Sequence, residues 1–456
     1  MEIQTFFSLQ RFFQTETTRH EQFVRRSLTK LRLTLYEKQD ALLSALHKDL
    51  GKNEIEAYTS ELSVVFSEIS YALKNLNAWM KPRKKPTPLF LLPGTSSVIP
   101  EPKGVVLILG PWNYPVQLLL APLVGALSAG NCVVIKPSEF TPATAAVIND
   151  IIASTFQSDH CRVVQGDAET AQKLCTLPWD HIFFTGSTRV GRSVMQTAAA
   201  NLTSVSLELG GKSPCIVLDD APTHKAAERI VWGKFLNAGQ TCIAPDTVYV
   251  QRNIAQKLIA DMVRTIQRFY GNNPERSPDY GRILDARHIE RLAGYLKNVN
   301  IITGGTYDTA KRYFAPTIVV NIHPKSPLAE EEIFGPILPV IEFDDVTELI
   351  TELSTKPKPL ALYIFSKSAL RQQQIFRALP SGTVCINDTI KQAVSSTLPF
   401  GGIQESGMGM YHGKASFDCF THYRSIFKTG YWGFSFHYPP YKVSIDFIKK
   451  IFRFFT

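Results

Sequence analysis

The sequence predicts an α/β fold of two doubly wound parallel sheets. From Gly104 onward, short apolar runs rich in β-branched residues alternate with stretches of helical periodicity, which is the pattern of strand–helix–strand units. A second alternating block begins at Pro214 and runs to about Asn387. The chain has 456 residues, enough for two or three domains, and its 44% hydrophobic and 20% charged residues are typical of a globular protein.

Each block is predicted to place functional residues where its strands end, because ligands of such sheets bind outside the carboxyl ends of the strands. The strands of the first block are Val105–Leu109, Cys132–Ile135, Arg162–Val164, His181–Phe184 and Ser204–Leu207, and its helices are Pro115–Ala129, Pro142–Phe156, Ala168–Thr176 and Arg189–Ala200. The second block opens with strand Cys215–Leu218, helix Ala226–Leu236, strand Thr247–Val250 and a long helix ending at Tyr270.

Two segments precede this alternation. Residues 1–79 are predicted to be helical, because His20–Leu50 carries apolar residues at helical spacing and Gly51 provides a stop. Residues 81–102 are rich in proline and are predicted to form an extended connecting arm.

The composition limits the function classes. Seven scattered cysteines without a C-x-x-C motif argue against a disulfide framework or a zinc site and favour a reducing compartment, so we expect a cytoplasmic protein with no metal. The N-terminus lacks the pattern of a signal peptide, and no apolar run approaches the roughly 18 residues of a membrane span.

The net charge of +9 comes without a nucleic-acid motif, so no nucleic-acid partner is expected. Basic residues spread over a large surface explain this charge most simply. Lys81–Pro86 and the C-terminal tail nevertheless form two local basic clusters.

Cys242, in the run FLNAGQTCIAPD, and Glu208, in LELGGKSP, are candidate catalytic residues. A thiol attacks a carbonyl as the thiolate, so a catalytic cysteine needs partial exposure and a lowered pKa. A carboxylate at a strand end is placed to activate that thiol, or a water, as a general base. Gly239 is expected to let the backbone approach a ligand closely. Alone, Cys242 fits a buried core cysteine equally well and Glu208 fits a helix cap; the pair favours covalent catalysis on a carbonyl.

Asn113 is presented by the turn PWNYP, which directly follows the first strand. Two prolines stiffen this turn, and an amide is an uncharged donor that suits an oxyanion. An ordinary proline turn is the competing interpretation, and only the other motifs favour the functional one.

Two further motifs indicate a dinucleotide. Lys136 and Glu139, in KPSE, follow the second strand and are placed to bind ribose hydroxyls; the acidic residue favours a free 2′-hydroxyl, hence NAD over NADP. The run TGSTRVG, residues 185–191, joins a strand to a helix and contains G-x-T-x-x-G, not the dinucleotide fingerprint. The free N–H groups of that helix start still suit a phosphate.

The acidic turn EEEIFGP, residues 330–336, supplies a carboxylate for a second ribose, and Phe334 is suited to pack beside a nicotinamide. A helix end is the competing interpretation of this turn.

Together these motifs resemble the aldehyde dehydrogenase superfamily, over about residues 10–425. The chain is most similar to the class 3 subfamily, which acts on fatty and aromatic aldehydes, because it starts directly at the N-terminal helices and carries MYHGKASF at residues 410–417. The resemblance implies oxidation of medium- or long-chain aliphatic or aromatic aldehydes to carboxylic acids with NAD, with NADP still open, and a homodimer.

The resemblance also implies roles for individual residues. Cys242 would attack the aldehyde, Asn113 and the backbone N–H of Cys242 would stabilise the oxyanion of the thiohemiacetal, and Glu208 would activate the water that hydrolyses the thioester. The cofactor would be bound by Lys136 and Glu139 at the adenosine ribose, by Gly186 and Ser187 at the pyrophosphate, by Glu332 and Phe334 at the nicotinamide riboside, and also by Gly191 and Trp112.

The same resemblance implies a domain organisation. An NAD-binding domain would comprise residues 1–79 and 103–209, and a catalytic domain residues 210–390. A small β arm for bridging and oligomerisation would comprise residues 80–102 and 391–430, followed by an apolar and basic tail over residues 431–456.

The chain departs from its relatives at three places. Lys391-Gln392 stands where an apolar residue and a histidine are frequent, Gln404-Glu405 follows a Gly-Gly-Ile where a small residue is commoner, and Thr247 replaces a frequent aromatic residue. The first two are expected near the substrate mouth, so they affect the expectation about substrate and leave the reaction type unchanged.

The tail mixes apolar and basic residues. Its apolar members are Val443, Ile445, Phe447, Ile448, Ile451, Phe452, Phe454 and Phe455, and one acid, Asp446, is set against Lys442, Lys449, Lys450 and Arg453. An amphipathic basic helix of this kind lies on an anionic membrane surface in one interpretation. In the other, it packs on a partner subunit or covers an apolar mouth.

Two other functions remain open from sequence. The thioester formed on Cys242 would pass to coenzyme A in an acyltransferase, although Glu208 favours water as the acceptor. A silent binding protein on the same scaffold is disfavoured by the intact Cys242, Glu208 and Asn113.

Overall fold

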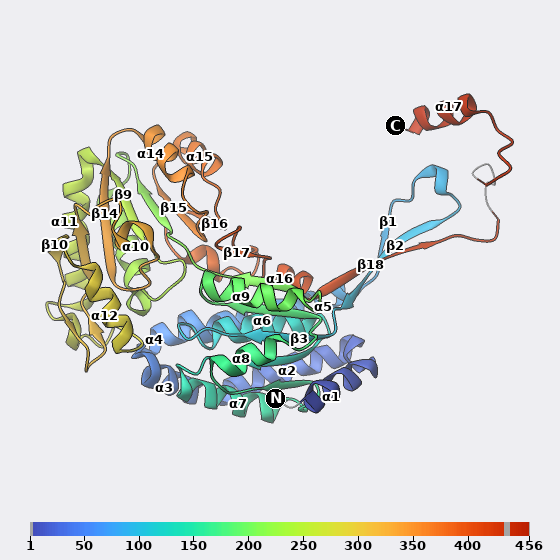
Figure 1. Ribbon diagram of the computed structural model, residues 1–456, viewed down its shortest axis with the longest axis horizontal. Coiled ribbons are helices and arrows are strands. Elements are labelled where there is room, and N and C mark those ends of the chain that lie inside the picture. Colours follow the sequence, from blue (N-terminus) through green and yellow to red (C-terminus); the bar gives the residue numbers. More distant parts are fainter. Residues whose placement is uncertain (1–2, 433–437, 456) are drawn as a thin grey trace.

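The computed structural model describes residues 3–432 and 438–455, and these form two large β-sheets, a projecting arm and a small hairpin (Figure 1). The first large sheet has the strand order β17-β7-β6-β3-β4-β5. Its strands are β3 (Val105–Leu109), β4 (Cys132–Lys136), β5 (Cys161–Val163), β6 (His181–Thr185), β7 (Ser204–Glu208) and β17 (Gly407–Met408).

Both faces of this first sheet are buried. Every residue of β3, β4 and β6 is buried, and successive side chains of β3 enter two different hydrophobic clusters. The helices that surround the sheet are α1 (Ile3–Gln14), α2 (Glu21–Glu37), α3 (Gln39–Leu50), α5 (Ser63–Met80), α6 (Gln117–Ser128), α7 (Pro142–Thr155), α8 (Ala168–Cys175) and α9 (Thr188–Ala199). The helical expectation for residues 1–79 is confirmed.

The second large sheet has the order β10-β13-β14-β9-β8-β15-β16. Its strands are β8 (Pro214–Val217), β9 (Thr247–Gln251), β10 (Asn300–Thr303), β13 (Thr317–Val320), β14 (Ile337–Phe343), β15 (Ala361–Phe365) and β16 (Thr383–Ile386). The remaining helices are α4 (Glu54–Ala57), α10 (Thr223–Phe235), α11 (Arg252–Tyr270), α12 (Ala286–Tyr295), α13 (Pro327–Glu330), α14 (Val346–Ser354), α15 (Ala369–Ala378), α16 (Gly413–Cys419) and α17 (Ile445–Phe455).

The predicted α/β fold of two doubly wound parallel sheets is confirmed, and each sheet also carries one antiparallel strand at an edge. β17 runs antiparallel to β7, and β10 runs antiparallel to β13. β17 returns from the far end of the chain, and β10 joins β13 through the hairpin of β11 (Tyr307–Asp308) and β12 (Tyr313–Phe314). Neither connection is a crossover helix, so nothing forces these two strands to run parallel.

The predicted arm is a three-stranded antiparallel sheet that projects from the body (Figure 1). β1 (Arg83–Lys85) and β2 (Thr95–Pro102) form a hairpin, and β18 (Thr421–Lys428) pairs with β2 along its whole length. The two large sheets use residues 105–208 with 407–408, and residues 214–386. The domain limits stay predictions.

The tail contains the helix α17, as predicted. Thr456 lies outside the described residues, as do the side chains of Ile451, Phe452, Phe454 and Phe455. Within residues 3–432 and 438–455, no helix combines the length and apolarity that a membrane crossing requires.

Candidate active site

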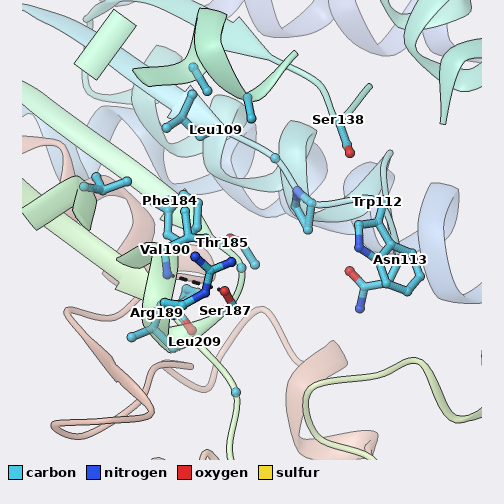
Figure 2. A pocket seen from close by; sticks show the side chains of 18 of the residues that line it. Leu109, Trp112, Asn113, Ser138, Phe184, Thr185, Ser187, Arg189, Val190 and Leu209 are labelled. Carbon is cyan, nitrogen blue, oxygen red and sulfur yellow. Dashed lines mark hydrogen bonds between the residues drawn. The ribbon is translucent and has the colours of Figure 1, made fainter. Parts of the chain in front are cut away.

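A cavity of about 620 Å³ opens where strands of the first sheet end. It is lined by the segments that follow β3, β4, β6 and β7, and by residues of the second sheet's part of the chain. Figure 2 shows Trp112 and Asn113 on one side of this cavity, with Ser187 and Val190 on another. Every predicted site residue except Gly191 lines it, in agreement with the rule for strand ends.

Asn113 is held by bonds to residues far away in sequence. Its carbonyl oxygen accepts from Lys52 Nζ at 3.0 Å and from Asn237 Nδ2 at 2.9 Å. Its own Nδ2 donates to the Gln240 carbonyl oxygen at 2.9 Å. An amide NH2 has two hydrogens, so the second remains for a ligand. These bonds join the PWNYP turn to the loop that carries Cys242.

The loop before Cys242 has an unusual backbone. Asn237 and Ala238 have φ values of 50° and 51°, a region that L-residues rarely adopt. A Cβ on Gly239, whose φ is +77°, would lie 2.3 Å from the Gly335 carbonyl oxygen. Gly239 therefore permits close approach of two protein segments, which corrects the expectation that it admits a ligand.

Cys242 is half-buried and lines the cavity, but its pKa is not lowered. Burial raises the pKa of the thiol, and the nearby carboxyl groups of Glu332 and Glu208 raise it further. The expectation of a lowered pKa is wrong for the protein alone. A cation or a proton acceptor in the cavity is needed to form the thiolate.

Glu208 ends β7, and its side chain is 2% exposed. Neither carboxyl oxygen has a hydrogen-bond partner among the residues that the structure describes. Burial raises the pKa of Glu208 well above its usual value. A buried carboxyl group with both oxygens free costs stability, and such groups gather where chemistry needs them.

Glu332 is a second poorly partnered carboxyl group in the cavity. Its Oε1 has no partner in the described part of the chain, and burial raises its pKa to about 8. A Cβ on Gly210 would lie 2.2 Å from Glu332 Oε2, so Gly210 leaves room for this carboxyl group.

The segment around Glu332 is fixed from three sides. Lys212 Nζ donates to the Glu331 carbonyl oxygen at 3.0 Å, and Asp246 Oδ2 accepts from the backbone N–H of Ile333 at 2.9 Å. Arg291 Nη2 donates to the Ile333 carbonyl oxygen at 2.9 Å. The segment is thereby placed beside the cavity before any ligand arrives.

Phe334 and Trp112 form an aromatic corner of the cavity. Their rings meet edge-to-face at 5.4 Å, and His288 meets Trp112 in the same way at 5.4 Å. Phe334 has a φ of 44°, a rare backbone conformation that turns the chain at this corner.

Lys136 and Glu139 pair with each other at the end of β4. The Nζ–Oε2 distance is 2.7 Å, and the lysine side chain is 5% exposed against 30% for the glutamate. The pair places an ammonium donor and a carboxylate acceptor on the cavity wall. The two hydroxyls of a ribose can bind to such a donor and acceptor.

The start of α9 is the third element suited to a dinucleotide. Ser187 caps the helix by accepting from the Val190 N–H at 3.4 Å (Figure 2). A Cβ on Gly186 would lie 2.5 Å from the Phe184 ring, so only glycine fits there. The helix start, the Lys136–Glu139 pair and the free Glu332 oxygen together fit a dinucleotide cofactor.

Gly191 does not line the cavity, and its contact with the cofactor stays a prediction. It lies within α9, and a Cβ there would come 2.6 Å from Leu209 Cδ2. Gly191 therefore lets α9 pack against Leu209, which does line the cavity.

Comparison with known proteins decides the family. Residues 14–426 match the profile described as Aldehyde dehydrogenase family. The chain belongs to the aldehyde dehydrogenase family. It is an enzyme that oxidises aldehydes to carboxylic acids, and the family uses NAD or NADP.

The relatives include class 3 members, as predicted. The chain is 44% identical to 4,4'-diaponeurosporen-aldehyde dehydrogenase of Staphylococcus aureus, over 99% of both chains. It is 41% identical to aldehyde dehydrogenase family 3 member A2 of Mus musculus, over 95% of this chain and 90% of the relative. The solved structure titled as the substrate-bound state of Staphylococcus aureus AldH superposes with a TM-score of 0.97 at 43% identity, over 99% of this chain and 100% of that one.

The positions that depart from other aldehyde dehydrogenases do not line the cavity described above. Lys391 pairs with Asp388 at the surface, and Gln392 Nε2 donates to the Tyr363 hydroxyl at 3.3 Å. Glu405 pairs with Arg192 at 3.0 Å. Thr247 is buried and lines a second cavity of about 500 Å³. None of these positions therefore shares the first cavity with Cys242.

Several functional contacts of this aldehyde dehydrogenase were missed from sequence. His288 and Arg291 line the cavity from α12, and Lys52 and Glu61 form a buried ion pair behind Asn113. The helical spacing of residues 286–295 gives no sign of a cavity wall. Lys52 gave no sequence signal either, because its burial, like that of Lys136 and Lys234, is visible only in the packed structure.

Proposed function

We propose that this aldehyde dehydrogenase oxidises medium- or long-chain aliphatic or aromatic aldehydes with NAD, through an acyl intermediate on Cys242. The observation that carries the proposal is the meeting of Cys242, Glu208 and Asn113 in one cavity, with both Glu208 oxygens unpartnered among described residues.

Cys242 Sγ attacks the carbonyl carbon and forms a thiohemiacetal. The free N–H of the Asn113 amide and the backbone N–H of Cys242 donate to the oxyanion. When bound, NAD supplies a cationic ring that favours the thiolate and accepts the hydride that leaves the carbonyl carbon. The acyl group then remains on Cys242 as a thioester.

Glu208 is the proposed base of the second half of the reaction. Its carboxylate takes a proton from water, the resulting hydroxide attacks the thioester carbon, and the carboxylic acid leaves as Cys242 is regenerated. A base works best with a pKa near the working pH, and burial moves the pKa of Glu208 in that direction.

Lys136, Glu139, Glu332 and the α9 start are the proposed cofactor contacts. The carboxylate of Glu139 would repel a 2′-phosphate and accept from a free 2′-hydroxyl, which supports NAD. The relative named for 4,4'-diaponeurosporen-aldehyde and the class 3 resemblance support the proposed aldehydes.

A homodimer is part of the proposal. β18 is an edge strand of the arm and β16 is an edge strand of the second sheet. Exposed edges offer unpaired N–H and C=O groups to a second chain.

The experiment is a set of kcat/KM values for straight-chain aldehydes of rising length and for benzaldehyde, with NAD and with NADP. We expect kcat/KM to rise with chain length and to be higher with NAD. Short aldehydes as the best substrates, or NADP as the better cofactor, would overturn that part of the proposal. Acyl-coenzyme A as the product when coenzyme A is added would replace hydrolysis by acyl transfer.

A further inference from the structure

The positive charge of the protein is concentrated in two segments. Residues 81–103 contain five basic residues and one acid, and residues 428–456 contain five basic residues and one acid. These segments hold eight of the nine net positive charges, so the rest of the chain is nearly neutral. Most basic residues still lie elsewhere in the chain, where acidic residues nearly balance them.

The first segment is the hairpin of the arm. All of β1 is exposed, and the side chains of Lys84 and Lys85 form no ion pair or hydrogen bond within the described ranges. The turn that follows is apolar and also exposed, with Leu89 at 56% and Leu92 at 40%. The unpaired lysines of β1 therefore lie next to an apolar turn. Exposed turns are usually polar, so an exposed apolar turn of this kind is unusual.

The second segment is the tail. Asp446, Lys449, Lys450 and Arg453 recur at spacings of three and four, so they share one face of α17. The other face is apolar, and Phe447 is 53% exposed. No ion pair involves the tail's bases in the part of the chain that the structure describes.

Both segments extend to the same end of the molecule, away from the two large sheets (Figure 1). Aromatic side chains also lie at the start of the tail, where Tyr431 and Trp432 are almost fully exposed. Tyrosine and tryptophan are favoured at membrane–water interfaces, because one end of each is apolar and the other polar.

We propose that the β1–β2 hairpin and α17 together bind an anionic lipid surface. Apolar side chains at the arm tip and on α17 would enter the headgroup region, and the flanking bases would lie against lipid phosphates. Two separate contacts on one body bind more tightly than either alone.

A second copy of this chain is a poorer occupant of these surfaces. It carries the same eight net positive charges in the same segments, and the rest of its chain has no excess of acidic residues to match them. The proposed dimer contact also leaves the hairpin free, because the sheet order β1-β2-β18 puts β1 and β18 at opposite edges.

The test is sedimentation of the full chain with vesicles of phosphatidylglycerol and phosphatidylcholine, compared with vesicles of phosphatidylcholine alone. We expect binding only to the anionic vesicles, with release as salt is raised. K84E/K85E and K449E/K450E should each weaken binding by at least about tenfold. K257E/K297E is the matched control, because it makes the same charge change at exposed positions outside both segments and should bind as the unaltered chain does.

Three outcomes would overturn the proposal. These are equal binding to neutral and anionic vesicles, an equal loss in the K257E/K297E control, and a change of oligomeric state in K449E/K450E with vesicle binding unchanged. The last would assign the tail to a partner subunit. Activity of each variant on a water-soluble aldehyde reports its folding, and the vesicle assay needs no turnover, so its failure would leave the proposed reaction untouched.

Discussion

Buried carboxyl groups of the framework and of the cavity are partnered in opposite ways. Glu61 accepts from Lys52 Nζ at 2.5 Å and from two backbone N–H groups at 2.9 and 3.0 Å. Both oxygens of Glu208 and one oxygen of Glu332, in contrast, have no partner among the residues described. Glu61 and Glu208 are buried, and Oε1 of the half-buried Glu332 is also shielded from solvent, so solvent exposure does not cause the difference.

This difference in hydrogen bonding distinguishes carboxyl groups that stabilise the fold from carboxyl groups that are available to react. A carboxylate with every oxygen satisfied stabilises the fold and has no capacity left for a substrate. A carboxyl group left without partners is costly and is available to a ribose or a water. Glu61 therefore belongs to the scaffold that holds Asn113, and the free oxygens of Glu208 and Glu332 support their proposed roles in the reaction and at the cofactor.

The largest expected effect is at the nucleophile. Cys242→Ala should lower kcat/KM for an aldehyde by at least about 10⁴-fold, because Cys175, the other cysteine on the cavity wall, is buried at the end of α8. Steady-state NADH production measures it. Cys385→Ala is the matched control, since Cys385 is also half-buried but lies on β16, and it should retain activity. Equal losses in both variants would refute the role of Cys242.

The next effect is on stability and concerns the framework carboxylate. Glu61→Gln leaves the buried ammonium of Lys52 without its partner and should cost about 3–5 kcal/mol of folding free energy. Denaturant unfolding of this variant and of Glu332→Gln gives the comparison. An equal or smaller loss for Glu61→Gln would remove the distinction between satisfied and free carboxyl groups.

A smaller effect is expected at the cofactor wall. Lys136→Met removes a charged donor and should raise the KM for NAD by about 10- to 100-fold. Initial rates at varied NAD and saturating aldehyde test this, with kcat changed only a few-fold. An unchanged KM together with a lower kcat would mean that Lys136 acts on the chemical step.

The smallest effect is a gain in stability with a defined pH dependence. An unfolded glutamate loses its proton near pH 4.3, whereas burial raises the pKa of Glu208, so the folded protein holds that proton to a higher pH. Stability therefore falls as pH rises from about 4.3 toward the folded-state pKa. Glu208→Gln removes this loss, so its apparent Tm should exceed that of the unaltered chain by about 2–4 °C at pH 8 and match it near pH 4. A lower Tm at pH 8 would show that Glu208 is partnered.

The sequence was most informative where chemistry lies within one short segment. The motifs around Cys242, Glu208 and Lys136 each follow a strand or helix of the predicted pattern, and these residues meet in one cavity. The assignment of Gly191 to the cofactor stays a prediction, because a glycine that packs a helix on Leu209 looks the same in sequence as one that contacts a phosphate.

Contacts between segments that are far apart in the chain could not be predicted from short sequence motifs. The bonds from Lys52 and Asn237 to the Asn113 carbonyl oxygen join positions that are 61 and 124 residues apart. Burial is the main cause of the raised pKa of Cys242, and Glu332 adds to it; only the packed structure reveals either. Local sequence patterns identify the functional side chains, whereas the pKa values of those side chains depend on packing between distant segments.

The central claim is that the unpartnered carboxyl group of Glu208 readies the water that frees the acyl group from Cys242. The most direct measurement is intact-protein mass spectrometry of Glu208→Gln after mixing with NAD and an aldehyde. The account predicts one burst of NADH, equal to the enzyme present, and an added acyl mass on Cys242 that persists. Absence of the acyl adduct with undiminished steady-state turnover would contradict it.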